Sequence, residues 1–110
     1  MPVERLLGQI DIFHSSDWTQ PPTNAKKVTT VHDLSPVLMP QYTDQRIVAA
    51  HTRRLQWVKK EVDAIISPSK ATKVDLIKLG FKESKIHVIY EAPDDLLKPA
   101  TEKEIQLIKQ

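Results

Sequence analysis

Two histidines and an aspartate follow predicted strands, and they are the residues of this chain best suited to chemistry. His14 ends a short predicted strand at residues 10–14, and His32 and Asp33 follow the β-branched run at residues 28–31. An imidazole can donate or accept a hydrogen bond near neutral pH, which suits contact with a hydroxyl group. A His-Asp pair also suits general base catalysis, and all three side chains are acceptable metal ligands. The residue types alone therefore leave an acid–base site, a metal site and a purely structural strand end open.

Strand geometry separates His32 from Asp33. Adjacent strand residues point to opposite faces, so both side chains cannot face one substrate if the strand stays regular. Pro36 stops the strand, and an aspartate in a turn readily accepts backbone N–H groups. We therefore expect His32 to be the functional residue and Asp33 to build the turn, with no bound metal. A metallohydrolase using His14 and His32 is an alternative, although the known His-Asp phosphohydrolases carry that pair on a helix.

Strands and helices alternate in the elements that would position these residues. Strands are predicted at residues 10–14, 28–31, 62–69 and 86–90, and helices at residues 43–61 and 70–79. This order predicts an α/β fold, a Rossmann-like, three-layer open parallel sheet of about four strands with right-handed crossovers. Ligands bind beyond the carboxyl ends of such strands. Both imidazoles should therefore face one edge of the sheet, and Ser69, the predicted N-cap of the second helix, could hold a ligand oxygen there.

The helix at residues 43–61 carries a predicted buried charge and a basic surface. Thr43 is its expected N-cap. His51 and Arg54 fall inside its apolar arc, and a buried Arg54 needs a carboxylate or carbonyl groups nearby. The basic residues with neighbouring aromatics suggest either weak peripheral membrane contact or, as we prefer, a solvated basic face; they are Arg53, Arg54, Lys59, Lys60, Trp57 and Tyr42.

Composition narrows the class of protein. The chain has 110 residues, a net charge of +2 and 40% hydrophobic residues, as in one ordinary globular domain. The charge is too small to indicate a nucleic-acid partner. There is no cysteine, which excludes disulfides and thiol catalysis and fits a cytoplasmic protein. No signal-peptide core and no run of about 20 apolar residues is present.

The motifs, in their order along the chain, resemble a known family. They are Asp11-Ile12-Phe13-His14, Pro21-Pro22, Val31-His32-Asp33-Leu34, Val62-Asp63-Ala64-Ile65-Ile66-Ser67-Pro68-Ser69, Asp75-Leu76 and Lys85-Ile86-His87-Val88-Ile89-Tyr90-Glu91. Over residues 10–98 the chain resembles the second half of the N-terminal domain of group 1 (family 4) glycosyltransferases of the GT-B fold. In that family the N-terminal domain binds the acceptor, the C-terminal domain binds the nucleotide-sugar donor, and the sugar is transferred with retention of configuration.

The resemblance implies a partial acceptor-binding domain at residues 1–98 and an interdomain linker with the start of a helix at residues 99–110. It places His32, the catalytic candidate, beside the transferred sugar, with His14 and Ser69 as further substrate-binding candidates and no resident cofactor. The family's glycine-rich donor loop has no counterpart, because the chain has only Gly8 and Gly80. We therefore expect a chain that is inactive without a C-terminal donor-binding domain, with a sugar or a lipid-linked molecule as acceptor.

Two features of the sequence allow a different interpretation. Glu83 and Glu91 have the spacing of a glutamate motif of the family's donor domain, but they flank a predicted strand of the acceptor domain, so we interpret the match as accidental. The α/β pattern by itself also suits a non-catalytic binding or regulatory module, which is the alternative function.

Overall fold

The computed structural model describes residues 1–15, 17–94, 96 and 98–108. In chain order the elements are α1 (Glu4–Leu7), β1 (Ile12–Ser15), β2 (Lys26–Thr30), α2 (Ser35–Leu38), the 3-10 turn η1 (Pro40–Tyr42), α3 (Gln45–Glu61), β3 (Ala64–Ser67), α4 (Lys70–Lys78), the 3-10 turn η2 (Glu83–Lys85), β4 (Ile86–Val88) and α5 (Glu102–Ile108). The predicted alternation of strands and helices is confirmed.

The four strands form one open sheet in the order β1-β2-β3-β4, and every neighbouring pair is parallel. The register aligns one buried residue from each strand in a row across the sheet, namely Ser15, Thr29, Ile65 and Ile86. Helices α3 and α4 cover this row, since Val58 and Leu76, both fully buried, share one core with Ile65. The α/β class with an open parallel sheet, predicted from the sequence, is therefore correct.

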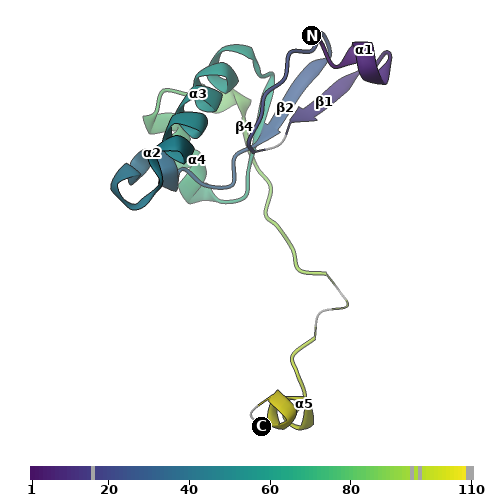
Figure 1. Ribbon diagram of the computed structural model, residues 1–110, viewed down its shortest axis with the longest axis vertical. Helices are drawn as coiled ribbons and strands as arrows, with labels where there is room; N and C mark the ends of the chain where they lie inside the picture. The colour runs from purple at the N-terminus through teal and green to yellow at the C-terminus, as the bar shows by residue number, and fades with distance from the viewer. Residues whose placement is uncertain (16, 95, 97, 109–110) are drawn as a thin grey trace.

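The opposite face of the sheet is more open. There, His14 aligns with Val28, and Thr30 aligns with Ile66, which aligns with His87. The two histidines are exposed and the other three residues are half-buried. The described residues thus supply two of the three expected layers. Helices α2, α3 and α4 lie together on one side of the sheet (Figure 1), so the third expected layer is not among the described elements.

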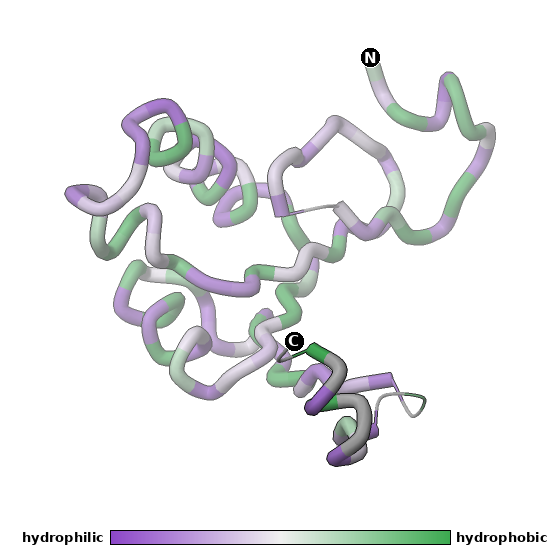
Figure 2. Tube along the Cα trace, turned by 60° about the horizontal axis from the view of Figure 1, so that its bottom comes forward, coloured by the Kyte–Doolittle hydropathy of each residue, from purple (hydrophilic) through white to green (hydrophobic). Residues whose placement is uncertain are grey.

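Helix α3 begins later than predicted. Asp44, not Thr43, is its N-cap, and the Asp44 side chain accepts a hydrogen bond from the Arg46 backbone N–H at 2.8 Å. The 3-10 turn η1 occupies the preceding residues, and a carboxylate is at least as good a cap as a hydroxyl. Apolar and polar residues follow one another along the helices in Figure 2, and in α3 the buried Leu55 and Val58 mark the side that faces the core.

After β4 the chain leaves the sheet as an extended segment that ends in α5, apart from the other elements (Figure 1). A helical start after Thr101 was predicted and is observed. The boundary placed at residue 98 stays a prediction, and residues 109–110 lie outside the described part of the chain.

Candidate functional site

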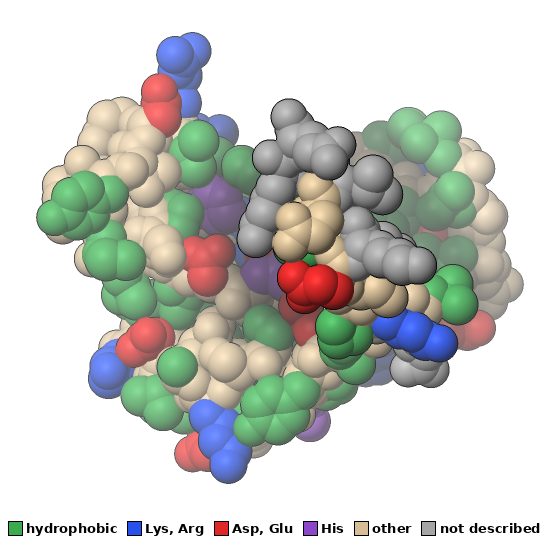
Figure 3. Space-filling model, turned by 90° about the horizontal axis from the view of Figure 1, so that it is seen from below, with side chains coloured by type: hydrophobic (Ala, Val, Ile, Leu, Met, Phe, Trp, Pro, Cys, Tyr) green, Lys and Arg blue, Asp and Glu red, His purple; other side chains and the backbone are tan. Residues whose placement is uncertain are grey.

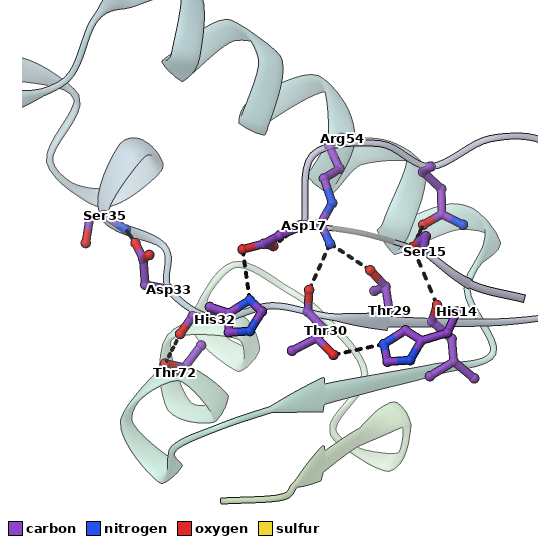
Figure 4. A network of polar contacts seen from close by, with 12 residues as sticks. His14, Ser15, Asp17, Thr29, Thr30, His32, Asp33, Ser35, Arg54 and Thr72 are labelled. Carbon is purple, nitrogen blue, oxygen red and sulfur yellow. Dashed lines mark hydrogen bonds and ion pairs between the residues drawn. The ribbon is translucent and has the colours of Figure 1, made fainter. Parts of the chain in front are cut away.

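A shallow, open hollow of about 380 Å³ lies at the carboxyl edge of β1 and β2. The side chains that line it are all polar, and they belong to His14, Ser15, Asp17, Thr30 and His32. Histidine and acidic side chains gather near the middle of the face seen in Figure 3, and Figure 4 shows how the lining residues turn toward one another. The hollow has the position at which open parallel sheets bind ligands.

His14 reaches the hollow from within β1. Its Nε2 lies 2.9 Å from the Thr30 hydroxyl of the neighbouring strand. Strands β1 and β2 are parallel, which is the condition for both imidazoles to lie at the same edge of the sheet. The structure therefore brings His14 and His32 to the same hollow, with Thr30 between them (Figure 4).

His32 lies two residues beyond β2, and half of its side chain is exposed. Its ring lies between two carboxylates. Nδ1 is 3.1 Å from Asp17, and Nε2 is 3.1 Å from Glu91 in the segment that follows β4. Only an imidazolium carries a hydrogen on both nitrogens, whereas a neutral ring donates from one and accepts at the other. The His32 backbone is also held, because its carbonyl accepts a hydrogen bond from the Thr72 hydroxyl of α4 at 3.3 Å.

Behind His32, Asp17 forms an ion pair with Arg54, whose side chain is only 3% exposed. Arg54 Nη1 is 2.8 Å from the Asp17 carboxylate, and Nη2 donates to the Thr29 hydroxyl at 2.7 Å and to the Thr30 carbonyl at 2.9 Å. Burial lowers the pKa of Arg54, and the Asp17 carboxylate opposes that shift. The predicted need of Arg54 for a carboxylate or carbonyls is confirmed, because it has both.

The loop that carries Asp17 is anchored at several points. Trp18 packs edge-on against His51 of α3, with 4.8 Å between ring centroids. The Ser15 hydroxyl donates to the Gln20 side chain at 2.6 Å. These contacts hold the backbone on either side of Asp17, so its carboxylate is fixed between Arg54 and His32.

Asp33 and Ser69, two further candidates from the sequence, do not line the hollow. The Asp33 carboxylate accepts a hydrogen bond from the Ser35 backbone N–H at 2.7 Å, which stabilises the turn into α2. The Ser69 hydroxyl caps α4, accepting from the Thr72 backbone N–H at 3.0 Å. Ser69 is thus connected to the His32 backbone only through Thr72.

Sequence reasoning missed Asp17 and Glu91 as partners of His32. Asp17 lies between the first two predicted strands, and nothing local marks it as the partner of two residues fifteen and thirty-seven positions away. The one available signal was the predicted demand of Arg54 for an anion. Among the described residues, no group of three or more His, Cys, Asp or Glu side chains lies close enough together to hold a metal ion.

The comparison with known families settles the relationship of the chain. The model of Glycosyltransferase Family 4 matches residues 2–95. The chain belongs to this family. The resemblance to its N-terminal domain, predicted from the motifs, is therefore confirmed. No curated protein and no solved structure gives a significant match.

For this family 4 domain, the structure also changes the expected basic surface. Arg54 was counted in it but is buried beneath Asp17. Lys59 donates to the Leu79 carbonyl at 3.0 Å, and Lys60 lies 5.9 Å from the Trp57 ring. Arg53, Lys59 and Lys60 stay exposed, so the basic surface of α3 loses only Arg54. Within the described part, no helix is both long and apolar enough to span a bilayer.

Proposed function

We propose that this chain is the acceptor-side domain of a retaining glycosyltransferase and that it forms one wall of the sugar-transfer site. The observation that carries the proposal is the hollow at the carboxyl edge of the parallel sheet, where His14, Thr30 and His32 present hydrogen-bonding groups. Membership of glycosyltransferase family 4 supports the class of reaction.

In the proposed reaction an acceptor hydroxyl bonds to the anomeric carbon of a nucleotide sugar on the face from which the phosphate leaves. The bond to the phosphate breaks, and the departing phosphate takes the proton of the hydroxyl. The transition state carries positive charge on the sugar ring and negative charge on the departing phosphate. The residues around the hollow are imidazoles, hydroxyls and carboxylates. This set suits the binding and orientation of sugar hydroxyls, and its contribution to the rate is positional.

His32 has the central role in this proposal. Its half-exposed ring lies over the hollow, and Nε2 faces the exposed Glu91 carboxylate, which a sugar hydroxyl can replace. His14 extends the same wall on the neighbouring strand. Ser69 stays a substrate-binding candidate at the N-terminus of α4, where its hydroxyl acts as the cap.

Among the described residues, those that line this hollow include no lysine or arginine to stabilise a departing diphosphate. Arg54, which lies behind the hollow, is buried, and its Nη1 and Nη2 bind Asp17 and β2. We therefore propose that a donor-binding domain supplies the opposite wall, and that these 110 residues do not turn over substrate alone. A peripheral membrane contact through α3 is a separate proposal, and flotation with anionic vesicles tests it.

The test combines binding with turnover. Saturation-transfer NMR of the 110-residue chain with a panel of methyl glycosides should show binding on the order of 1 mM, as expected of a half-site. His32→Ala should weaken it about tenfold, because one hydrogen bond is lost. His87→Ala is the matched control, since His87 is exposed on β4 and does not line the hollow. Binding that is equal in all three proteins, or sugar transfer by the chain alone, would contradict the proposal.

A further inference from the structure

We propose that Asp17 is a positioning residue that fixes the orientation and the tautomer of His32, and that Arg54 anchors Asp17 for this purpose. The proposal deepens the proposed function, because it assigns to His32 Nε2 the role of hydrogen-bond acceptor for a sugar hydroxyl. Asp17 acts through His32, and the substrate it would serve is any sugar that presents a hydroxyl to the hollow.

The side chains of Arg54, Asp17 and His32 contact one another in that order, from the core to the surface. Arg54 is 3% exposed, Asp17 is 22% exposed and His32 is 50% exposed. Asp17 uses its two oxygens separately, with Oδ1 2.8 Å from Arg54 Nη1 and Oδ2 3.1 Å from His32 Nδ1 (Figure 4). A carboxylate held at both oxygens cannot rotate freely, so the ring it contacts has one preferred orientation.

Arg54 is itself a rigid anchor. Its Nη2 hydrogen bonds to Thr29 and Thr30 tie the guanidinium to β2, the strand that leads into His32. The backbone of His32 is held from the other side by the Thr72 hydroxyl. The strand, the helix and the ion pair therefore fix both ends of the His32 side chain.

Asp17 also selects the tautomer. An ionised carboxylate only accepts hydrogen bonds, so a neutral His32 ring bonded to Asp17 carries its hydrogen on Nδ1. Glu91, at Nε2, competes for that hydrogen. Glu91 is 68% exposed and has no second partner among the described contacts, whereas Asp17 is largely buried and held by Arg54. The ring hydrogen of His32 therefore lies on Nδ1 and bonds to Asp17. Nε2 is then the acceptor that a sugar hydroxyl can reach.

The deciding measurement is the tautomer of His32 in the chain labelled with ¹⁵N. Two-bond ¹H–¹⁵N spectra at about pH 8.5, above the ordinary histidine pKa of about 6.5, distinguish Nδ1–H from Nε2–H in a neutral ring. A hydrogen bond to a charged group should favour Nδ1–H by about tenfold to hundredfold in the wild-type chain. Asp17→Asn should remove this preference, since the amide can donate to Nδ1 as well as accept from it.

Two matched variants identify the cause. Asp33→Asn makes the same chemical change next to His32 but at a carboxylate that bonds Ser35, so Nδ1–H should persist. Glu91→Gln removes the competing carboxylate at Nε2, and Nδ1–H should persist there too. If Asp17→Asn fails to fold, the tautomer of His32 in the wild-type chain and in these two variants still tests the proposal.

The outcomes separate this proposal from the proposed function. Predominant Nε2–H in the wild-type chain, or Nδ1–H unchanged in folded Asp17→Asn, would overturn the role of Asp17 even if methyl glycosides bind. Nδ1–H that depends on Asp17, with no glycoside binding, would leave the role of Asp17 intact and contradict the proposed function. With both correct, Asp17→Asn should weaken glycoside binding about as much as His32→Ala does.

Discussion

Replacing Arg54 with methionine tests the ion pair beneath the hollow. Methionine keeps much of the aliphatic stem but removes the guanidinium, which makes contacts of 2.8 Å, 2.7 Å and 2.9 Å with Asp17, Thr29 and Thr30. Breaking a buried ion pair costs about 3–5 kcal/mol, because the other charge is left without a partner. Asp17 keeps 22% of its side chain exposed, so water recovers part of that loss, and we expect a cost of about 3 kcal/mol.

That cost is large for a chain of this size. At about 0.05–0.15 kcal/mol per residue, such a domain has roughly 5–15 kcal/mol of stability in total. Urea unfolding followed by circular dichroism measures the change as a shift in midpoint at constant slope. Arg53→Met is the matched control, because Arg53 is exposed on the same helix and its loss should cost less than about 0.5 kcal/mol.

A double-mutant cycle then isolates the pair. Asp17→Asn combined with Arg54→Met should cost less than the sum of the single changes, because each removes the same contact. The reasoning is refuted if Arg54→Met is as mild as Arg53→Met, or if the two changes add without coupling.

Three further predictions concern stability, each read from urea midpoints. Leu76→Ala should cost about 2–5 kcal/mol, because Leu76 is 0% exposed at the centre of the core; a cost below about 1 kcal/mol would contradict this packing. Ser69→Ala should cost about 1 kcal/mol by removing the α4 cap, and no effect would mean that the cap is not formed. The Thr23 hydroxyl is the main cause that lowers the pKa of Glu4 from 4.5 to about 2. Stability from Glu4 is therefore present above about pH 4.5 and lost as the pH falls toward 2. The advantage of the wild-type chain over Glu4→Gln should shrink over that interval, and a constant difference would contradict the shift.

The strands and long helices could be predicted because their signals are local. The β-branched run at residues 28–31 has few alternatives to a strand. Helix α3 has an apolar side, and α4 lies between a capping Ser69 and Gly80. The error at the start of α3 has a local cause as well, since Thr43 and Asp44 are adjacent and both can cap. Whether helices cover one face or both faces of the sheet is not determined by local sequence signals. The run at residues 28–31 has apolar or neutral residues on both faces, yet Val28 and Thr30 on one of those faces stay half-buried.

Only the residues of the site that lie at strand ends could be predicted from the sequence. His14 and His32 were expected at one edge because parallel strands place their carboxyl ends together, and both line the hollow. Asp17 and Glu91 reach His32 from loops that come before β2 and after β4. Contacts of this kind depend on the path by which each loop returns to the sheet. No residue pattern within either loop predicts that path. A buried arginine on a helix was the one indirect sign of Asp17.

The central claim, that the His32 edge is a sugar-binding wall, is tested most directly by locating bound sugar on the chain. Methyl glycosides titrated into ¹³C- and ¹⁵N-labelled protein should shift resonances of His14, Thr30 and His32 together, with one common dissociation constant. In His32→Ala the shifts of His14 and Thr30 should need about tenfold more glycoside, and in His87→Ala they should be unchanged. Shifts confined to the apolar groove between Leu55 and Phe81, or none at any residue of the hollow, would contradict the account.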